Sequence, residues 1–275
     1  MATKIIRPLT NSKRGTSYLD FSALSKEKTP KSLRAVLTKN AGRNNTGRIT
    51  VAHRGGGEKR FYRLVNFGNL VENKAKIVSI DYDPNRSANI AKIEYQSGKL
   101  DYILATDKMK VGGSVECGEG VAVRSGNRTK ISQIPVGSTI FNIEIMPGRG
   151  GKICRSAGNY ATLLGVENNI ATLKLPSSEV RHVPANCYAS IGAVGNAEAM
   201  NVSFGSAGRM RHKRIRPTVR GKAKNPVDHP HGGGEGGTSI GMPGPKTPWG
   251  MPALGHRTRN KKNRNQKFII KRRSK

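Results

Sequence analysis

Positions that alternate between apolar and polar side chains recur along the middle of the chain in runs of six to eight residues. Such a period of two is typical of half-buried β-strands, and the runs are rich in the strand-favouring residues Val, Ile and Tyr. Turn-forming residues separate the runs, at Gly55–Gly57, Asp83–Asn85 and Ser97–Gly98. Five such runs within about 60 residues predict a small antiparallel barrel of the oligonucleotide-binding (OB) class. They are Arg48–His53, Arg60–Phe67, Ala75–Tyr82, Ile90–Gln96 and Leu100–Ala105.

A second group of alternating runs follows Ile134–Gly137, with turns at Glu167–Asn169 and Pro184–Asn186. The helical period of 3.6 residues is scarce, and only Thr29–Leu37 and Ser206–Arg211 are expected to form short helical turns. The fold class is therefore mainly β: an OB-fold barrel, then an SH3-like barrel, with long basic irregular extensions at both ends. The runs that predict the SH3-like barrel are Thr139–Ile145, Tyr160–Leu164, Ala171–Leu175, Glu179–Val183 and Ala189–Ile191.

Charge is distributed unevenly around this predicted body. The 275-residue chain has 49 Lys and Arg against 17 Asp and Glu, a formal charge of +32. Residues 1–63 have a net charge of +12 and residues 205–275 one of +17, whereas residues 64–204 have only +3. We therefore divide the chain into a basic N-terminal extension (1–41), an OB-fold barrel (42–125), an SH3-like barrel (126–204) and a basic Gly/Pro-rich C-terminal extension (205–275).

Self-repulsion keeps two such extensions expanded unless a polyanion neutralises them, and nucleic acid is the obvious polyanion. A membrane surface is the weaker alternative, because neither extension has an amphipathic apolar face and no run of 18 apolar residues occurs. The N-terminus lacks an apolar signal region, and residues 1–30 fit a transit peptide only loosely. Cys117, Cys154 and Cys187 lie far apart, which argues against a disulfide framework or a zinc site and favours reduced thiols.

The segment Val219–Gly237 is too rich in Gly and Pro to form a helix or a strand, and alone in water it is expected to be disordered. Basic segments flank it at Arg209–Arg220 and Arg257–Lys275, and their side chains can neutralise phosphates. Glycine runs let backbone amides approach phosphate, although in a β protein they are also typical of hairpin connections. None of these runs has the spacing of a nucleotide-hydrolysing loop. The runs are Gly55–Gly57, Gly148–Gly151 and Gly232–Gly237.

The sequence Asp228–His231 (DHPH) admits two enzymatic interpretations, a His general base oriented by a carboxylate and a metal-binding His pair. Against both, adjacent Asp and His side chains need not face each other, and no Ser or Cys nucleophile context stands out. A structural role beside RNA fits better, since His can stack on bases and bond phosphate or ribose. Trp249, the only Trp, is either a local cap on the body or a platform for an RNA base.

Several long stretches resemble the bacterial-type large-subunit ribosomal protein L-two family, from about Asn11 to the C-terminus. The chain departs from that family at Arg211–Arg214, where a Trp-Leu-Gly segment is usual, and at Lys222 and Lys224, where small or apolar residues are common. Pro252–Arg259 resembles plastid and cyanobacterial members more than other bacterial ones. The stretches are GRNNTGRITVAHRGGG (Gly42–Gly57), IDYDPNRSANIA (Ile80–Ala91), NIEIMPGRGGKICRSAG (Asn142–Gly158), RPTVRG (Arg216–Gly221), NPVDHPHGGGEG (Asn225–Gly236) and TPWG (Thr247–Gly250).

The resemblance implies that the OB-fold barrel (42–125) binds RNA and that the extensions, the C-terminal one (205–275) included, thread into large-subunit (23S-type) rRNA near the peptidyl-transferase region. It also implies support for subunit association, tRNA binding and peptide-bond formation. It implies that His229 is architectural, that no residue is catalytic or metal-ligating, and that no cofactor is needed beyond Mg²⁺ carried by the rRNA. A loop near the peptidyl-transferase region is implied for Asn225, Asp228, His229, His231, Gly232, Gly233 and Gly234. Contacts with rRNA are implied for Arg54, Arg60, Arg149, Lys152, Arg155, Arg209, Arg211, Arg214, Arg216, Arg220, Lys222, Lys224, Trp249, Arg257 and Arg259.

The implied partners are large-subunit rRNA, neighbouring ribosomal proteins and the small subunit through an intersubunit contact, with no membrane and no homo-oligomer. The implied location is the ribosome, with the plastid (chloroplast) stroma favoured and a bacterial cytoplasm as the alternative. Two other function classes stay open. One is an enzyme acting through Asp228 and His229, and the other is a freestanding RNA chaperone or DNA-compacting protein.

Overall fold

The structure is a computed structural model that describes residues 3–235, 237–260, 262 and 264–273. Gly236, in the last glycine run, lies outside the described residues, as do Lys261, Asn263, Ser274 and Lys275 in the basic C-terminus. The chain divides into two compact units. Unit 1 contains Met1–Thr38, Lys59–Ser206 and Lys267–Lys275, and unit 2 contains Lys39–Glu58 and Ala207–Gln266.

A four-stranded antiparallel sheet in unit 1 is built mainly from the first group of alternating runs. Its order is β7-β6-β5-β8, with β5 at Lys74–Asp81, β6 at Ile90–Tyr95, β7 at Leu100–Leu104 and β8 at Ser114–Glu116. Along β5 every second side chain from Ala75 to Asp81 is buried, the period of a half-buried strand. Ala75 and Ile77 pack with Ile93 and Tyr95 in one apolar cluster, whereas the hydroxyl of the buried Ser79 donates to the carboxylate of Asp81 (2.8 Å).

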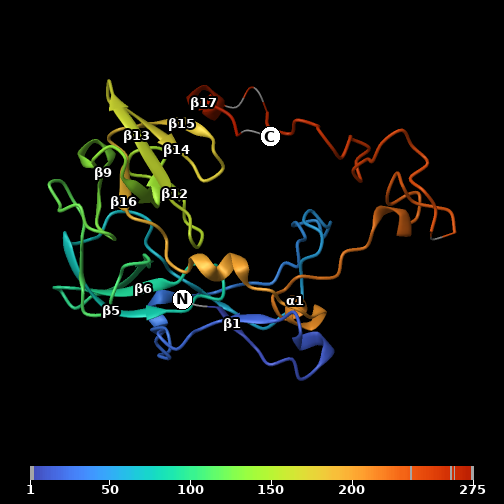
Figure 1. Cartoon of the computed structure of the whole chain (residues 1–275), viewed down its shortest axis with the longest axis horizontal. Coiled ribbons are helices and arrows are strands. Elements are labelled where there is room, and N and C mark those ends of the chain that lie inside the picture. Colours follow the sequence, from blue (N-terminus) through green and yellow to red (C-terminus); the bar gives the residue numbers. More distant parts are fainter. Residues whose placement is uncertain (1–2, 236, 261, 263, 274–275) are drawn as a thin grey trace. The chain divides into compact units, whose positions relative to one another are not determined.

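A seven-stranded antiparallel sheet contains the second group of runs, and Figure 1 shows its strands β13, β14 and β15 side by side. Ile140, Leu163 and Leu173 are fully buried in its core. The order is β17-β15-β14-β13-β10-β16-β9. The bounds are β9 Arg128–Lys130, β10 Thr139–Phe141, β13 Ala161–Glu167, β14 Ile170–Lys174, β15 Val180–Pro184, β16 Tyr188–Ile191 and β17 Ile269–Lys271.

Short strand pairs and turns of 3-10 helix supplement the two larger sheets, and the mainly-β class is confirmed. The strand pairs are β1 (Thr3–Ile5) with β2 (Ser17–Leu19), β3 (Arg34–Val36) with β4 (Phe61–Arg63), and β11 (Ile143–Glu144) with β12 (Gly151–Ile153). The 3-10 helices are η1 (Asn11–Lys13), η2 (Lys31–Leu33), η3 (Ile131–Gln133), η4 (Ala197–Asn201), η5 (Gly221–Ala223) and η6 (Arg264–Phe268).

Arg48–His53 is not a strand, so the prediction for this run is wrong. Its apolar side chains have no core to join, since Ile49 is 61% exposed and Val51 is 51% exposed. Its ladder pairing is a single bridge from Ile49 to Arg43. Alternation alone therefore does not make a strand where no second layer covers the apolar face.

One of the two helical predictions agrees with the structure, and the other agrees only in part. The α-helix α1 spans Ala207–His212 and agrees with the turn predicted near Ser206–Arg211. Thr29–Leu37, by contrast, holds only the single turn η2 before β3 begins at Arg34. Strands that alternation did not reveal also occur, and β17 is one of them. It lies in the C-terminal extension and pairs with β15.

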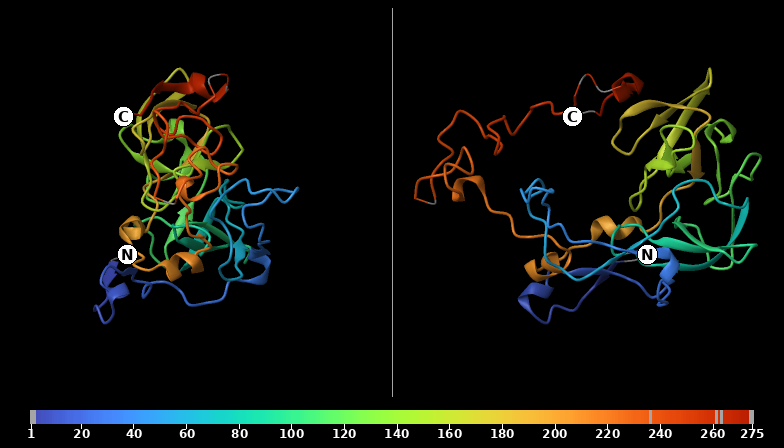
Figure 2. Two further views of the ribbon diagram at one scale, coloured as in Figure 1. Left: turned by 90° about the vertical axis from the view of Figure 1, so that its right-hand side faces the viewer. Right: turned by 180° about the vertical axis from the view of Figure 1, so that it is seen from behind.

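Unit 2 is organised differently from unit 1. Apart from α1, the 3-10 turn η5 (Gly221–Ala223) and the start of η6, its described residues form turns, single bridges and coil. Figure 2 shows a long irregular stretch of orange to red ribbon in this part of the chain. Among these residues no apolar side chain is buried, and the one buried side chain is that of His229, which is 8% exposed. Hydrogen-bonded turns rather than an apolar core therefore hold unit 2 together.

Candidate nucleic-acid interface

Two stretches of unit 2 that lie far apart in the sequence pair with each other. The amide of Gly55 donates to the carbonyl oxygen of Arg214 (3.1 Å), and the amide of Arg216 donates to that of His53 (2.9 Å). Nδ1 of the same His53 lies 3.0 Å from the carbonyl oxygen of Pro217 and must be the donor, since a carbonyl oxygen only accepts. This pairing holds the basic segment that contains Arg214 and Arg216 against the glycine run Gly55–Gly57.

Gly57 permits this close approach. Its φ of +72° lies in the left-handed region that favours glycine. A Cβ atom there would lie 2.5 Å from Cγ of Arg214 and 2.8 Å from the carbonyl oxygen of His212. The guanidinium group of Arg214 donates to the carbonyl oxygen of Glu58 (2.9 Å). The run Gly55–Gly57 is therefore not a hairpin connection, because it admits a basic segment of the same chain.

The pairing brings four of the predicted RNA-binding residues together. Arg54 forms a bridge with Ile215, between Arg214 and Arg216. The side chains of Arg54, Arg211 and Arg216 are exposed, and that of Arg214 is half-buried by its bond to the backbone. An exposed guanidinium group can bind a phosphate with two parallel hydrogen bonds.

The DHPH sequence occupies a tight loop of unit 2. The amide of His229 donates to the carbonyl oxygen of Asn225 (3.2 Å), and the amide of Gly232 donates to that of His229 (2.8 Å). A further bond from the amide of Gly233 to the carbonyl oxygen of Lys224 (3.1 Å) closes the loop. A Cβ atom on Gly232 would lie 2.3 Å from the carbonyl oxygen of Asn225, so the loop has room for glycine only at this position.

The two histidines of this loop are linked by hydrogen bonds. Nδ1 of His229 accepts from the amide of His231 (3.0 Å), and Nε2 of His231 accepts from the amide of Lys246 (2.8 Å). The ring centroids are 4.8 Å apart with an interplanar angle of 59°. Because an accepting ring nitrogen has no proton, both imidazoles are neutral in this arrangement.

The His229 ring is buried against Gly221. A Cβ atom on Gly221 would lie 2.5 to 2.8 Å from three atoms of that ring. Burial, with the nearby His231 and Lys224 as weaker causes, lowers the pKa of His229 from its ordinary 6.5. The neutral ring that the hydrogen bonds require is thus also the form that this site favours.

This geometry does not provide a carboxylate-oriented general base. Among the described residues, no hydrogen bond joins the exposed carboxylate of Asp228 to His229, whose Nδ1 is occupied by the amide of His231. A general base needs a free nitrogen within hydrogen-bond reach of a substrate proton. The carboxylate–histidine pair that this enzymatic interpretation requires is therefore not formed between these two residues.

Trp249 is presented at the tip of a second turn. The amide of Gly250 donates to the carbonyl oxygen of Thr247 (2.9 Å), and a bridge joins Lys246 to Pro252 at the base of the turn. The side chain of Trp249 is 82% exposed, which argues against its role as a cap on the body. The bond between Lys246 and His231 ties this turn to the histidine loop.

The other predicted site residues of unit 2 lie along the same chain stretches without forming one cluster. Arg220 is exposed, whereas Arg209, Lys222 and Lys224 are half-buried. Arg257 and Arg259 are exposed on coil that follows the Trp249 turn. Gly234 has a φ of +78° and directs the chain away from the closed loop.

Four predicted RNA-binding residues belong to unit 1. Arg149 is exposed in the turn Gly148–Gly151, which is a hairpin connection from β11 to β12, and Lys152 is exposed on β12. The guanidinium carbon of Arg155 lies 4.4 Å from the ring centroid of Phe67. Arg60 donates to the carbonyl oxygen of Pro84 (2.8 Å) and is half-buried, so part of its donor capacity is already used.

Sequence reasoning missed two basic residues that the structure connects to these sites. The guanidinium carbon of Arg86 lies 5.4 Å from the Phe67 ring, which therefore has two guanidinium groups nearby. In unit 2, Nζ of Lys39 donates to the carbonyl oxygen of Gly57 (2.9 Å). A signal for Arg86 was present, because it lies in a stretch that carries the family resemblance.

Two searches of the described residues bear on other classes of site. No group of three or more His, Cys, Asp or Glu side chains there could hold a metal ion. No helix in the same part of the chain has the length and apolar character needed to cross a lipid bilayer.

Small β-sheet bodies, Gly-rich segments and exposed Arg side chains are typical of RNA-binding proteins. Two family models match the chain: "Ribosomal Proteins L2, RNA binding N-terminal domain" over residues 30–117 and "Ribosomal Proteins L2, C-terminal domain" over residues 124–250. Together they cover more than three quarters of its length. The chain belongs to the ribosomal protein L2 family.

Membership confirms the predicted fold class, an OB-fold barrel followed by an SH3-like barrel. It also identifies a structural ribosomal protein that binds RNA and functions in translation. Its partners are rRNA and other ribosomal proteins, and its location is the ribosome.

Proposed function

We propose that this protein is a structural constituent of the large ribosomal subunit whose unit 2 binds 23S-type rRNA near the peptidyl-transferase region. One observation carries the proposal. Unit 2 has 18 basic and three acidic side chains, a net charge of +15, yet no apolar side chain among its described residues is buried. Such a segment repels itself in water, and rRNA phosphates would neutralise it.

The exposed side chains suggest two different roles in RNA binding. Arg54, Arg211 and Arg216 would neutralise phosphates, and Trp249 at its turn would stack on an unpaired base. The closed histidine loop would stand near the peptidyl-transferase region, with His229 as a packing residue. From there the protein would support subunit association, tRNA binding and peptide-bond formation that RNA performs.

Salt dependence tests the rRNA proposal. Binding of the full-length protein to fragments of large-subunit rRNA should weaken with salt, with a log–log slope of roughly −0.7 to −0.9 for each phosphate neutralised. Replacing both Arg211 and Arg216 with Gln should reduce the magnitude of this slope by about 2. Replacing Lys99 and Lys110, two exposed lysines of unit 1, is the matched control. A flat salt dependence of the unmodified protein would contradict the proposal.

The variant His229→Gln distinguishes an architectural role of this residue from a catalytic one. If His229 only packs against Gly221, the variant should assemble poorly or join subunits poorly, and correctly assembled ribosomes should retain their rate of peptide-bond formation. His256→Gln, a change at an exposed histidine of the same unit, is the control. Loss of the rate with assembly intact would favour the enzyme alternative instead.

Sedimentation addresses the freestanding alternatives. We expect the native protein to travel with large subunits in a sucrose gradient, whereas an RNA chaperone or DNA-compacting protein would remain near the top. The likeness of Pro252–Arg259 to plastid members supports the plastid stroma as the location. Immunodetection in isolated plastids against a bacterial cytoplasm tests that assignment.

A further inference from the structure

Unit 1 contains a cavity of about 730 Å³ that the RNA-binding surfaces do not use. Its walls come from β1, the segment after β2, the strand β5, the segment after β7 and the start of η4. Pockets that accept drug-sized ligands or a few peptide residues have volumes of roughly 300 to 1,000 Å³. The cavity is therefore large enough to receive a ligand of that size.

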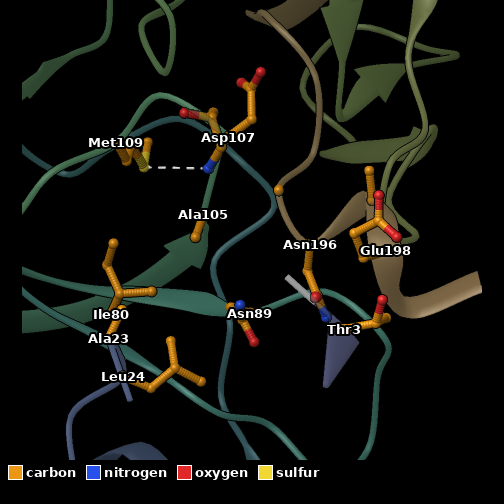
Figure 3. Close-up of a pocket in the computed structure, with 13 residues that line it drawn as sticks. Thr3, Ala23, Leu24, Ile80, Asn89, Ala105, Asp107, Met109, Asn196 and Glu198 are labelled. Atoms are coloured by element: carbon orange, nitrogen blue, oxygen red, sulfur yellow. Dashed lines mark hydrogen bonds between the residues drawn. The ribbon is translucent and has the colours of Figure 1, made fainter. Parts of the chain in front are cut away.

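One wall of the cavity is apolar. Leu24 and Met109 are each 9% exposed, Ala105 is 3% exposed, and Ile80 is half-buried beside them. Figure 3 shows Leu24 and Ile80 on one side of the space and Asn196 and Glu198 on the other. An apolar side chain that entered would lose its contact with water at this wall.

The charged groups of the lining are acidic. Asp107 and Glu198 line the cavity, and among its described lining residues there is no Lys, Arg or His. Neither carboxylate is in an ion pair with a described residue, although Glu198 accepts a hydrogen bond from the side chain of Asn201 (2.7 Å). In a chain of net charge +32, this lining would repel a phosphate and attract a cation.

Asn196 adds a buried polar side chain to the lining. Its Nδ2 donates to the carbonyl oxygen of Ser87 (2.7 Å), but its Oδ1 has no hydrogen-bond partner and the residue is only 8% exposed. A buried acceptor without a partner is uncommon in proteins. Because this oxygen is closed to solvent, it does not itself bond a ligand in the cavity.

We propose that this cavity docks a peptide segment of another protein in which a Lys side chain adjoins an apolar side chain. The ammonium group would lie beside Asp107 and Glu198, and the apolar neighbour would lie on Leu24, Ile80 and Met109. A free polyamine satisfies the carboxylates but offers no bulky group for the apolar wall. The proposal does not rest on rRNA binding, and the two can succeed or fail separately.

A labelled model peptide tests the docking site directly. The probe is fluorescein-Gly-Leu-Lys-Ile-Gly-amide, titrated with full-length protein at about 150 mM salt, with fluorescence anisotropy as the readout. We expect saturable binding, and at least tenfold weaker binding when Gln replaces the Lys of the peptide. Absence of binding at millimolar protein, or equal binding of the Gln peptide, overturns the proposal.

Variants of the protein locate the binding. Asp107→Asn and Glu198→Gln should each weaken binding about threefold and together about tenfold, as expected for solvent-accessible ion pairs. Ala23→Lys, at an exposed lining position, should abolish binding by placing an ammonium group of the chain itself at the cavity. Glu167→Gln removes the same charge from an exposed position outside the lining and should change nothing.

Two further results would overturn the proposal. One is an equal loss of binding in the Glu167→Gln variant, because the attraction would then come from overall charge. The other is full competition by spermidine combined with unchanged binding of a peptide in which Gly replaces Leu and Ile, because the occupant would then be a simple cation.

Discussion

The two units have nearly the same net charge, +17 in unit 1 and +15 in unit 2, but unit 1 distributes it over 195 residues and unit 2 over 80. Unit 1 buries Ile, Leu and Val side chains between strands, whereas among the described residues of unit 2 only the side chain of His229 is buried. Burial of these apolar side chains therefore stabilises the folded state of unit 1 without a binding partner. Unit 2 depends on hydrogen bonds whose net contributions are small, about 1 kcal/mol each.

This difference shows how one chain can combine a self-sufficient fold with a segment adapted to a polyanion. Unit 1 neutralises part of its charge internally, as in the buried pair of Arg128 and Glu144, whose side chains are 3.0 Å apart and almost inaccessible to solvent. In unit 2 the arginines mostly remain exposed. The same residue type thus serves packing in one unit and recognition in the other.

The largest expected effect separates the two units by stability. Replacing Ile93, which is fully buried in β6, with Ala should lower the free energy of unfolding by about 2 to 5 kcal/mol, because the change leaves a cavity. Leu254→Ala in unit 2, where the side chain is 78% exposed, should change it by about 0.5 kcal/mol or less. Chemical denaturation followed by circular dichroism measures both. Equal losses would show that unit 2 also has an apolar core.

The next effect concerns the ladder inside unit 2. Gly57→Ala should open the pairing with Arg214, since the new Cβ atom would collide with its side chain and the φ of +72° disfavours Ala. We expect at least tenfold faster hydrogen exchange of the Arg216 amide, with the exchange of β6 unchanged. Gly47→Ala has a similar φ of +78° but no atom within 4 Å, so it separates backbone strain from collision. Equal acceleration in both variants would refute the role of close approach.

Trp249 provides a smaller effect, on binding rather than on folding. Trp249→Ala should weaken binding to an rRNA fragment with an unpaired base by about 1 to 3 kcal/mol, the usual loss of base–aromatic stacking. Since the side chain is 82% exposed, the melting temperature should stay the same. Trp249→Phe should recover part of the affinity. Unchanged affinity of the Ala variant would remove Trp249 from the interface.

The smallest effect is a pH dependence confined to the histidine loop. Burial holds the pKa of His229 below 6.5, so the folded loop binds its proton less readily than an unfolded chain does. The loop's stability is therefore fully present above pH 6.5 and is lost as the pH falls through the lowered pKa. Proton NMR of the His229 ring and exchange of the His231 amide between pH 7.5 and 5 measure this. His229→Gln should abolish the dependence, and an unaltered dependence would assign it to another group.

Much of the fold was predictable because unit 1 follows simple rules. At every second position of β5 and β6 the residues Ala75, Ile77, Ala91, Ile93 and Tyr95 are apolar and buried, so there the pattern and the packing agree. In β9 the pattern and the packing disagree. Arg128 is polar but only 3% exposed, because it pairs with Glu144, and the neighbouring polar residue Thr129 is only 1% exposed. A sequence pattern that equates polar with exposed cannot detect such a strand.

The candidate site was predictable in composition but not in geometry. Charge counts pointed to the arginines of unit 2, and the family resemblance pointed to His229. Neither could show that the run Gly55–Gly57 contacts Arg214, some 160 residues away, because only the folded chain brings them together. Nor could adjacency in sequence show that His229 is bonded to His231 rather than to Asp228.

The bond from Lys246 to His231 has a consequence for the thermodynamics of assembly. A segment this rich in glycine has many conformations available, and fixing each residue costs roughly 1 to 2 kcal/mol of conformational entropy. The linked histidines and the Trp249 turn restrict those conformations before any partner arrives. These intramolecular contacts thus offset part of the conformational entropy lost when the segment becomes ordered. A preorganised loop can therefore bind RNA with more of its interaction energy retained as affinity.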